Sequence, residues 1–352
     1  MISVVVTIIA LGIIVVIHEL GHMLAARRAG VGVLEFSIGM GPIIMSKQVR
    51  ETLYSLRAFP FGGFVKLAGM DDVEEPVKDE LNYQLKPWYD RASIIVAGSF
   101  FNLILGFLIF TIVFWVSGIP EANSKLKSVV ESSVAAQAGL LAQDEVVLVN
   151  GQPVKGVHAD VIGAIKASNG NPMILQVRRG EELIDVSVVP ALSKSGVYQI
   201  GVMFDWTVKK YEFLESAKFG AESTWSVTKG VFKSLQLLMT GRVSLKEMSG
   251  PVGIVQFASH GLDRSTPDFM GVVALISISL GVFNLLPFPV LDGGHLVLLV
   301  IETLRGKPFS DATQMWIQRV GIFFLIFMMV FALWNDTISW KTRSSLFNTF
   351  FK

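Results

Sequence analysis

Two histidines and a glutamate stand in a stretch of the chain that is otherwise apolar. His18 and His22 are four residues apart in VVIHELGHMLAA (15–26), and Glu19 follows the first of them. On a helix this spacing places both imidazoles on one face, where they can bind the same metal ion. The pattern H-E-x-x-H indicates a zinc site with the glutamate as general base for a zinc-bound water. The competing interpretation is that both histidines only hydrogen-bond neighbouring helices.

A catalytic zinc site needs a third protein ligand and an open position. Asp292, in NLLPFPVLDGGH (284–295), is the best candidate. His18 lies about 25 Å along a first span that enters from outside. A third span running in the same direction would bring Asp292 to the same cytoplasmic side of a ~30 Å core. The alternative is that the Asp-Gly-Gly run is only a turn leaving the membrane.

Other residues near these candidate ligands can contribute to the site. Pro287 and Pro289 break the helix before the aspartate and let water approach. Asn284 lies two turns before it and can hydrogen-bond either a substrate carbonyl or another helix. In AGSFFN, Gly98 and Asn102 are one turn apart. This spacing fits a close helix contact with a polar group facing the site, or plain small-residue packing.

The whole chain is too apolar for an ordinary soluble protein. Of its 352 residues, 51% are hydrophobic and 17% are charged, and the mean hydropathy is +0.55, whereas about a quarter of the residues of an average domain are charged. The formal net charge of +1 gives no reason to expect nucleic acid as a partner. The absence of cysteine excludes disulfides and cysteine-ligated zinc.

Runs of about 20 mostly apolar residues predict membrane-spanning helices. Four are expected, at 1–26, 93–116, 269–292 and 314–335. The fourth is the weakest because it contains Gln318 and Arg319. Basic residues at both ends of the 27–92 loop indicate that this loop is cytoplasmic. The segment between spans two and three and the tail at 336–352 are then outside, although the basic residues of that tail argue against the last step.

The outer segment has the features of one small α+β domain at 120–205. Asn150-Gly151 between two apolar runs is a strong hairpin signal, and a helical stretch and a second strand pair follow. This pattern resembles a bacterial PDZ domain. Gly139 and Leu140 would form the loop that holds the C-terminal carboxylate of a peptide. The groove either binds such a peptide or binds nothing and only blocks bulky substrates.

Between this domain and the third span, the region 206–268 shows helical periodicity. Apolar residues recur at steps of three and four from Leu214 to Leu238, with lysines between them. This pattern predicts an amphipathic helix. It lies on the outer membrane face or packs under the PDZ domain; the sequence is consistent with both.

In the cytoplasmic region, TLYSLRAFPFGGFVKL (52–67) predicts two short strands around Phe61, Gly62 and Gly63. A hairpin this apolar can dip into the membrane beside the metal and clamp an unwound substrate as an added strand. These three residues and Pro287 are therefore expected to contact substrate. The alternative is an ordinary cytoplasmic hairpin.

Six segments together resemble the site-2 protease family of intramembrane zinc metalloproteases, specifically its bacterial RseP type. They are HELGH (18–22), FSIGMGP (36–42), FPFGGFVKLAGM (59–70), GSFFN (98–102), SGPVGI (249–254) and NLLPFPVLDGGH (284–295). Carried over by position, the resemblance implies one zinc ion bound by His18, His22 and Asp292. It also implies Glu19 as the catalytic acid/base. Asn284 and Asn102 become candidates for positioning the substrate.

These observations predict a polytopic α-helical membrane protein of the bacterial inner (plasma) membrane. It has four transmembrane helices, one inserted extracytoplasmic PDZ (α+β) domain and a membrane-associated cytoplasmic β-hairpin, with the active site near the cytoplasmic side. The resemblance implies regulated intramembrane proteolysis of single-span membrane proteins, such as anti-sigma factors already cut outside by another protease. Lipid and a possible PDZ peptide ligand are the other expected partners. Best-known members of this type carry two tandem PDZ domains, whereas this chain has room for one.

Two functions of other classes compete with proteolysis. In a metal transporter, the buried histidines and aspartate would be transit ligands. In a membrane scaffold, the PDZ domain would bind partners and the zinc site would be inert. The glutamate beside the first histidine argues against a transporter, and the complete set of ligands and base argues against a scaffold.

Overall fold

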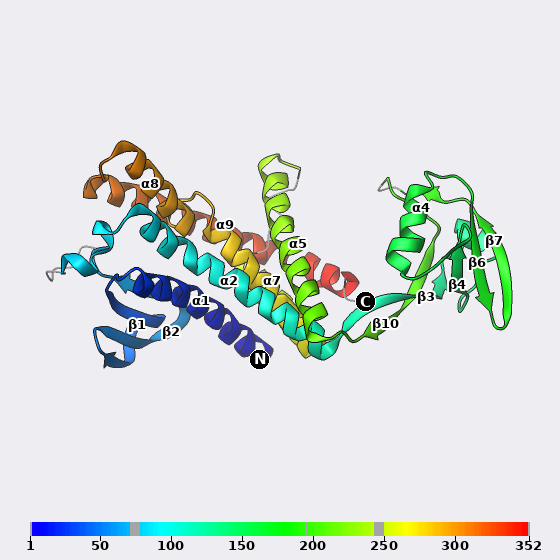
Figure 1. Cartoon of the computed structure of the whole chain (residues 1–352), viewed down its shortest axis with the longest axis horizontal. Helices are drawn as coiled ribbons and strands as arrows, with labels where there is room; N and C mark the ends of the chain where they lie inside the picture. The colour runs from blue at the N-terminus through cyan, green and yellow to red at the C-terminus, as the bar shows by residue number, and fades with distance from the viewer. Residues whose placement is uncertain (1, 71–77, 194–195, 243–249, 351–352) are drawn as a thin grey trace. The chain divides into compact units, whose positions relative to one another are not determined.

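The computed structural model describes residues 2–70, 78–193, 196–242 and 250–350. The chain forms two compact units (Figure 1). The first combines Met1–Trp115 with Glu212–Lys352, and the second is Val116–Tyr211. An insertion between two membrane helices was the expected arrangement for the outer domain.

The first unit is built from helices. They are α1 (Ile2–Arg28), α2 (Trp88–Ser117), α5 (Phe213–Met239), α6 (Pro251–Arg264), α7 (Thr266–Asn284), α8 (Asp292–Arg305) and α9 (Asp311–Phe350). Among the residues described, α1, α2, α7 and α9 contain stretches long and apolar enough to cross a membrane. The expectation of four long apolar helices is confirmed, and α9 continues beyond the expected end of the fourth span at 335.

The expected helix at 269–292 is instead two helices. The first, α7, ends at Asn284, and Asp292 is the first residue of α8. The chain turns between them because Pro287 and Pro289 have no backbone N–H to continue the helical ladder. The sequence predicted this break correctly, but placed the aspartate at the end of the third span. It lies at the beginning of a new helix.

Small residues set how closely the central helices approach. A methyl group at Gly21 of α1 would lie 2.5 Å from the carbonyl oxygen of Ala97 in α2. One at Gly281 of α7 would lie 2.8 Å from that of Ser99 in α2. Glycine therefore lets α2 contact both neighbours backbone to backbone, which is the usual solution where lipid gives helices no hydrophobic reason to associate. These contacts hold α1 and α7 on α2, side by side in Figure 1.

The strands of the first unit are β1 (Val33–Val49) and β2 (Thr52–Leu67). Their pairing folds back on itself: 35–38 lies opposite both 53–56 and 63–66, while 45–49 lies opposite 52–56. The two halves of 52–67 are thus separate strand segments, as expected. They do not form a hairpin with each other, because each pairs with 35–38.

The second unit is a small α+β fold. Its elements are β3 (Ile119–Val129), α3 (Val134–Gln137), β4 (Glu145–Val149), β5 (Gln152–Pro153), a π-helical turn η3 (Val157–Ile162), α4 (Gly163–Ala167), β6 (Met173–Arg179), β7 (Glu182–Val188), β8 (Ala191–Leu192), β9 (Tyr198–Gln199) and β10 (Val202–Lys209). The main sheet has the order β10-β3-β4-β6-β7, with β5 beside β4. Asn150 and Gly151 both have positive φ, 48° and 79°, and form the predicted turn.

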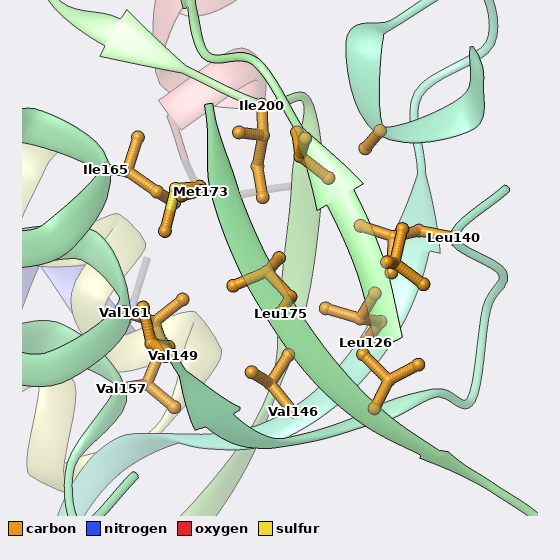
Figure 2. Packing of buried hydrophobic residues seen from close by; sticks show 14 residues of the cluster. Leu126, Leu140, Val146, Val149, Val157, Val161, Ile165, Met173, Leu175 and Ile200 are labelled. Atoms are coloured by element: carbon orange, nitrogen blue, oxygen red, sulfur yellow. The ribbon is translucent and has the colours of Figure 1, made fainter. Parts of the chain in front are cut away.

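The core of this unit is aliphatic. In β6, Met173, Leu175 and Val177 are buried and the residues between them face outward. Figure 2 shows Met173 and Leu175 among the buried side chains of this core, together with Val161 and Ile165 from the helical segment. The alternating pattern of this strand is therefore explained by one buried face.

Candidate metal centre

Three side chains converge between α1, α2 and α8. The Nε2 atoms of His18 and His22 are 3.2 Å apart, and Oδ2 of Asp292 lies 3.2 Å from the first and 3.6 Å from the second. Both histidines are buried. The sequence predicted this set of residues, and the structure brings them together although Asp292 is 270 positions further along the chain than His22 (292 − 22).

The backbone of α2 fixes the orientation of His22. Its Nδ1 lies 2.8 Å from the carbonyl oxygen of Ile94. A carbonyl accepts hydrogen bonds only, so Nδ1 carries the proton and Nε2 keeps its lone pair facing the cluster. On α2, a methyl group at Gly98 would lie 2.3 Å from Nε2 of His22 and 2.8 Å from a ring carbon of His18. Glycine at 98 therefore makes room for the ligands.

The other histidine is held by Asn102, which is fully buried. Its Nδ2 lies 3.3 Å from Nδ1 of His18, and its Oδ1 has no hydrogen-bond partner among the described residues. A half-turn of the amide exchanges these two atoms, so that Oδ1 accepts a hydrogen bond from the Nδ1–H of His18. His18 then has its Nε2 lone pair free for a metal, as His22 does. After this exchange Oδ1 is paired with His18, and the amide nitrogen takes the position without a partner among the described residues.

The donor set suits zinc. Two neutral imidazoles and one carboxylate provide the three protein ligands of a catalytic site, with a further position open to water or substrate. All three ligand atoms lie within 4.8 Å of one another. His18, His22 and Asp292 are the residues that would hold the ion.

The asparagine and glutamate predicted to act in the reaction border this cluster. Nδ2 of Asn284, at the end of α7, lies 3.2 Å from Nε2 of His18. Glu19 faces β2: a methyl group at Gly63 would lie 3.5 Å from its Cγ, and its carboxylate interacts with the backbone of Val65. The Glu19 side chain therefore lies between the candidate metal ligands and a β-strand segment.

The family model of peptidase family M50 matches residues 6–328. The chain belongs to peptidase family M50. The regulator of sigma-W protease RasP of Bacillus subtilis is 30% identical over 413 residues, covering 95% of this chain and 98% of that protein. The zinc metalloprotease RasP of Bacillus licheniformis is 27% identical over 412 residues, covering 95% and 98%. The solved PDZ domain of an SdrC-like protein of Listeria monocytogenes matches 24% of this chain and 87% of that domain, with 21% identity and a TM-score of 0.22.

The M50 peptidase is a zinc metalloprotease, as its sequence motifs predicted. Its remaining predicted substrate residues lie at different places. Pro287 is exposed in the turn between α7 and α8. Gly62 has φ of 90°, and a methyl group there would meet the Met40 side chain at 2.7 Å. Gly63 is buried, while the side chain of Phe61 lies outside the described part of the structure.

In the loop predicted to hold a peptide carboxylate, the N–H groups of Gly139 and Leu140 already donate to the carbonyl oxygens of Ala136 and Ala135, at 3.1 and 3.0 Å. Leu140 is buried in the core, and the carbonyl oxygen of Gly139 accepts a hydrogen bond from Arg179. A cavity of about 560 Å³ lies elsewhere, and its lining includes Ile162 and Ile165, the 198–202 segment and Phe204. Ile200, Gly201 and Val202 form part of this lining, and Gly201 has φ of 80°.

Sequence reasoning also missed a buried ion pair of the peptidase. Arg91, at the start of α2, lies 3.1 Å from Glu302 of α8. The two residues are charged positions on mainly apolar helices and are 211 residues apart in the chain. Nothing local in the sequence pairs them.

Proposed function

We propose that this zinc metalloprotease is an intramembrane endopeptidase that cuts the transmembrane segments of single-span membrane proteins. One observation carries the proposal: the metal ligands and Glu19 lie on or beside helices apolar enough to cross a membrane. A metal site at such depth serves chemistry on a bond at the same depth, because buried ionisable groups in a span are costly unless they function.

Each residue around the candidate metal ligands has a different proposed role in the reaction. Zinc, when bound, supplies Lewis acidity for the attacking water and the scissile carbonyl. Glu19 takes a proton from that water and returns it to the leaving amine. Asn284, next to His18 Nε2, donates its amide N–H to the substrate carbonyl. Asn102 is fully buried behind His18, so its proposed role is to orient that imidazole rather than to contact substrate.

The 63–66 segment is the proposed clamp for an unwound substrate. It pairs with 35–38 and lies beside Glu19. A peptide in a helix shields its carbonyls, whereas an extended peptide added to a strand presents them to the metal. Pairing at this segment would place the scissile bond next to the general base.

The second unit is proposed to be a PDZ domain outside the membrane that controls access. Basic residues flanking 27–92 support a cytoplasmic position for that loop, and thus an outer position for the inserted unit. The 560 Å³ cavity beside β10, which is an edge strand, is the proposed peptide groove. The Bacillus subtilis relative is named a regulator of sigma-W protease, which supports a role of this chain in sigma-factor regulation. The substrate we propose is an anti-sigma factor already cut outside, in envelope stress signalling.

The test uses tagged single-span proteins in membranes that contain the full-length enzyme. Each is supplied with its outer domain intact and trimmed, against wild type and Glu19→Gln, with and without a zinc chelator. We expect cleavage of the trimmed proteins, lost in the variant and in chelator, with zinc still bound to Glu19→Gln. Undiminished cleavage by this variant would refute the role of Glu19. Zinc flux into vesicles without cleavage would support a transporter instead.

A further inference from the structure

The helix that carries Asp292 turns few of its side chains toward the rest of the first unit. Along α8, Val297, Val300 and Leu304 are 42%, 49% and 82% exposed. Its buried residues are two glycines, Leu299 and Glu302. By contrast, α1 is fixed on α2 by the close contact at Gly21. The start of α8 is held by Gly293 and Gly294, which pack against carbonyl oxygens of the preceding turn, and by a 3.4 Å hydrogen bond from Ser99 of α2 to Asp292. The far end of α8 needs a further interaction to fix it.

Glu302 makes that interaction. Its Oε2 lies 3.1 Å from the guanidinium of Arg91 on α2, and both side chains are largely buried, with 10% and 18% exposed. The guanidinium also lies 5.1 Å from the ring centre of Tyr83, which is itself buried. Arg91 is therefore held between a carboxylate and an aromatic face.

The same carboxylate has a second partner. Its Oε1 accepts the backbone N–H of Phe309 at 3.0 Å, in the connection to α9. Gln314 of α9 donates to the carbonyl of Phe309 at 3.2 Å. Glu302 thus joins α2, α8 and the start of α9. A cavity of about 120 Å³ beside it is lined by Gln314 and Gln318, which accounts for polar residues in the fourth apolar helix.

We propose that the Arg91–Glu302 pair is a positioning device for the metal centre. Arg91 lies about two turns before Gly98 on α2, and Glu302 lies about 15 Å along α8 from Asp292. Because both helices continue from the ion pair to the metal site, fixing them to each other fixes Oδ2 of Asp292 relative to the histidines. The inference rests on the zinc chemistry of the proposed function and concerns metal binding before any cleavage.

The experiment measures zinc affinity of the full-length protein by competition with a chelator, and thermal unfolding of the metal-free protein. The variants are Arg91→Gln, Glu302→Gln and the exchange Arg91→Glu with Glu302→Arg. Lys307→Gln, an exposed charge just after α8, is the matched control. We expect each neutralisation to weaken zinc binding about 10-fold or more, as loss of groups behind the ligands does. The exchange should recover only part of this loss, because it restores the ion pair but leaves the Phe309 N–H without its acceptor and removes the cation from the Tyr83 ring. The control should change affinity less than twofold.

Zinc affinity within twofold of wild type in both neutralised variants would overturn the proposal, even if metal-free unfolding shifts, since the pair would then be only a structural contact. If either variant does not fold, Arg91→Lys is judged by the same affinity criterion, because it keeps the charge and loses the forked geometry. Failure of the protease proposal would be recognised separately, since no substrate is present in this measurement.

Discussion

In the metal centre, the residues that decide the geometry are small or polar: Gly98 leaves space for two imidazoles, and Asn102 and the Ile94 carbonyl orient them. In the 116–211 unit, an aliphatic core that includes alternating strand residues determines the geometry. Adding a methyl group is therefore expected to weaken zinc binding in the first region. Removing buried methyl groups is expected to destabilise the second. The two regions should also respond independently, because each is a compact unit.

The sharpest test of this contrast is Gly98→Ala. The new methyl group would meet His22 Nε2 at 2.3 Å, so the imidazole must leave the cluster. We expect zinc affinity to fall about a thousandfold, or ~4 kcal/mol. The control is Gly230→Ala in α5, where a methyl group meets nothing within 4 Å. There the change should slightly stabilise the helix and leave zinc binding as it was. Equal zinc affinity in both variants would contradict the role of Gly98.

The same contrast explains what the sequence could predict. His18, Glu19 and His22 are four residues apart at most, so helix geometry alone places them together. Asp292 was found because a third span running in the same direction as the first would bring it to the same side of the membrane as His18. Gly98 and Asn102 were ambiguous, because a small residue in a span is equally typical of helix packing. Their role depends on which residues of α1 they face. A local sequence pattern does not show this.

Two errors have physical reasons as well. Asp292 was placed at the end of a helix because a hydrophobic run does not show on which side of a proline turn the next helix begins. Here Gly293 and Gly294 allow α8 to start directly against the turn, where methyl groups would approach carbonyl oxygens to 2.3 and 2.0 Å. Leu140 was assigned to a peptide groove from its neighbour Gly139, but an apolar side chain beside a turn is as readily buried in the core.

The opposite change, removal of a buried side chain, is tested in the second unit by Leu175→Ala. This side chain is fully buried in β6, and its removal leaves a cavity among the residues of Figure 2. We expect a loss of about 3 kcal/mol in the stability of this unit. Hydrogen exchange of the β6 amides in the full-length protein would measure it. Zinc affinity should not change, and a parallel loss of zinc would show that the two units are energetically coupled.

The smallest expected effect compares two neighbouring ion pairs in the second unit. The side chain of Asp144 is 1% exposed and accepts hydrogen bonds from Nε and Nη2 of Arg179, both at 2.8 Å. In the other pair, the side chains of Glu145 and Arg178 are 43% and 50% exposed. Burial raises the pKa of Asp144, but hydrogen bonds from Arg179 and the Leu141 N–H outweigh it and hold that pKa below its usual value. Asp144→Asn should therefore cost about 2 kcal/mol at neutral pH, and Glu145→Gln about 0.5 kcal/mol or less.

The pH dependence of this difference follows from the direction of the pKa shift. A carboxylate whose pKa is lowered by folding stabilises the protein above its unfolded pKa, about 3.9, and loses this contribution as the pH falls through the lower folded value. The stability gap between wild type and Asp144→Asn should therefore be constant from pH 7 to about 5 and shrink below pH 4. Hydrogen exchange of the β4 and β6 amides across this range would measure it. A gap that persists undiminished at pH 3 would mean that the Asp144 carboxylate contributes through packing and not through its charge.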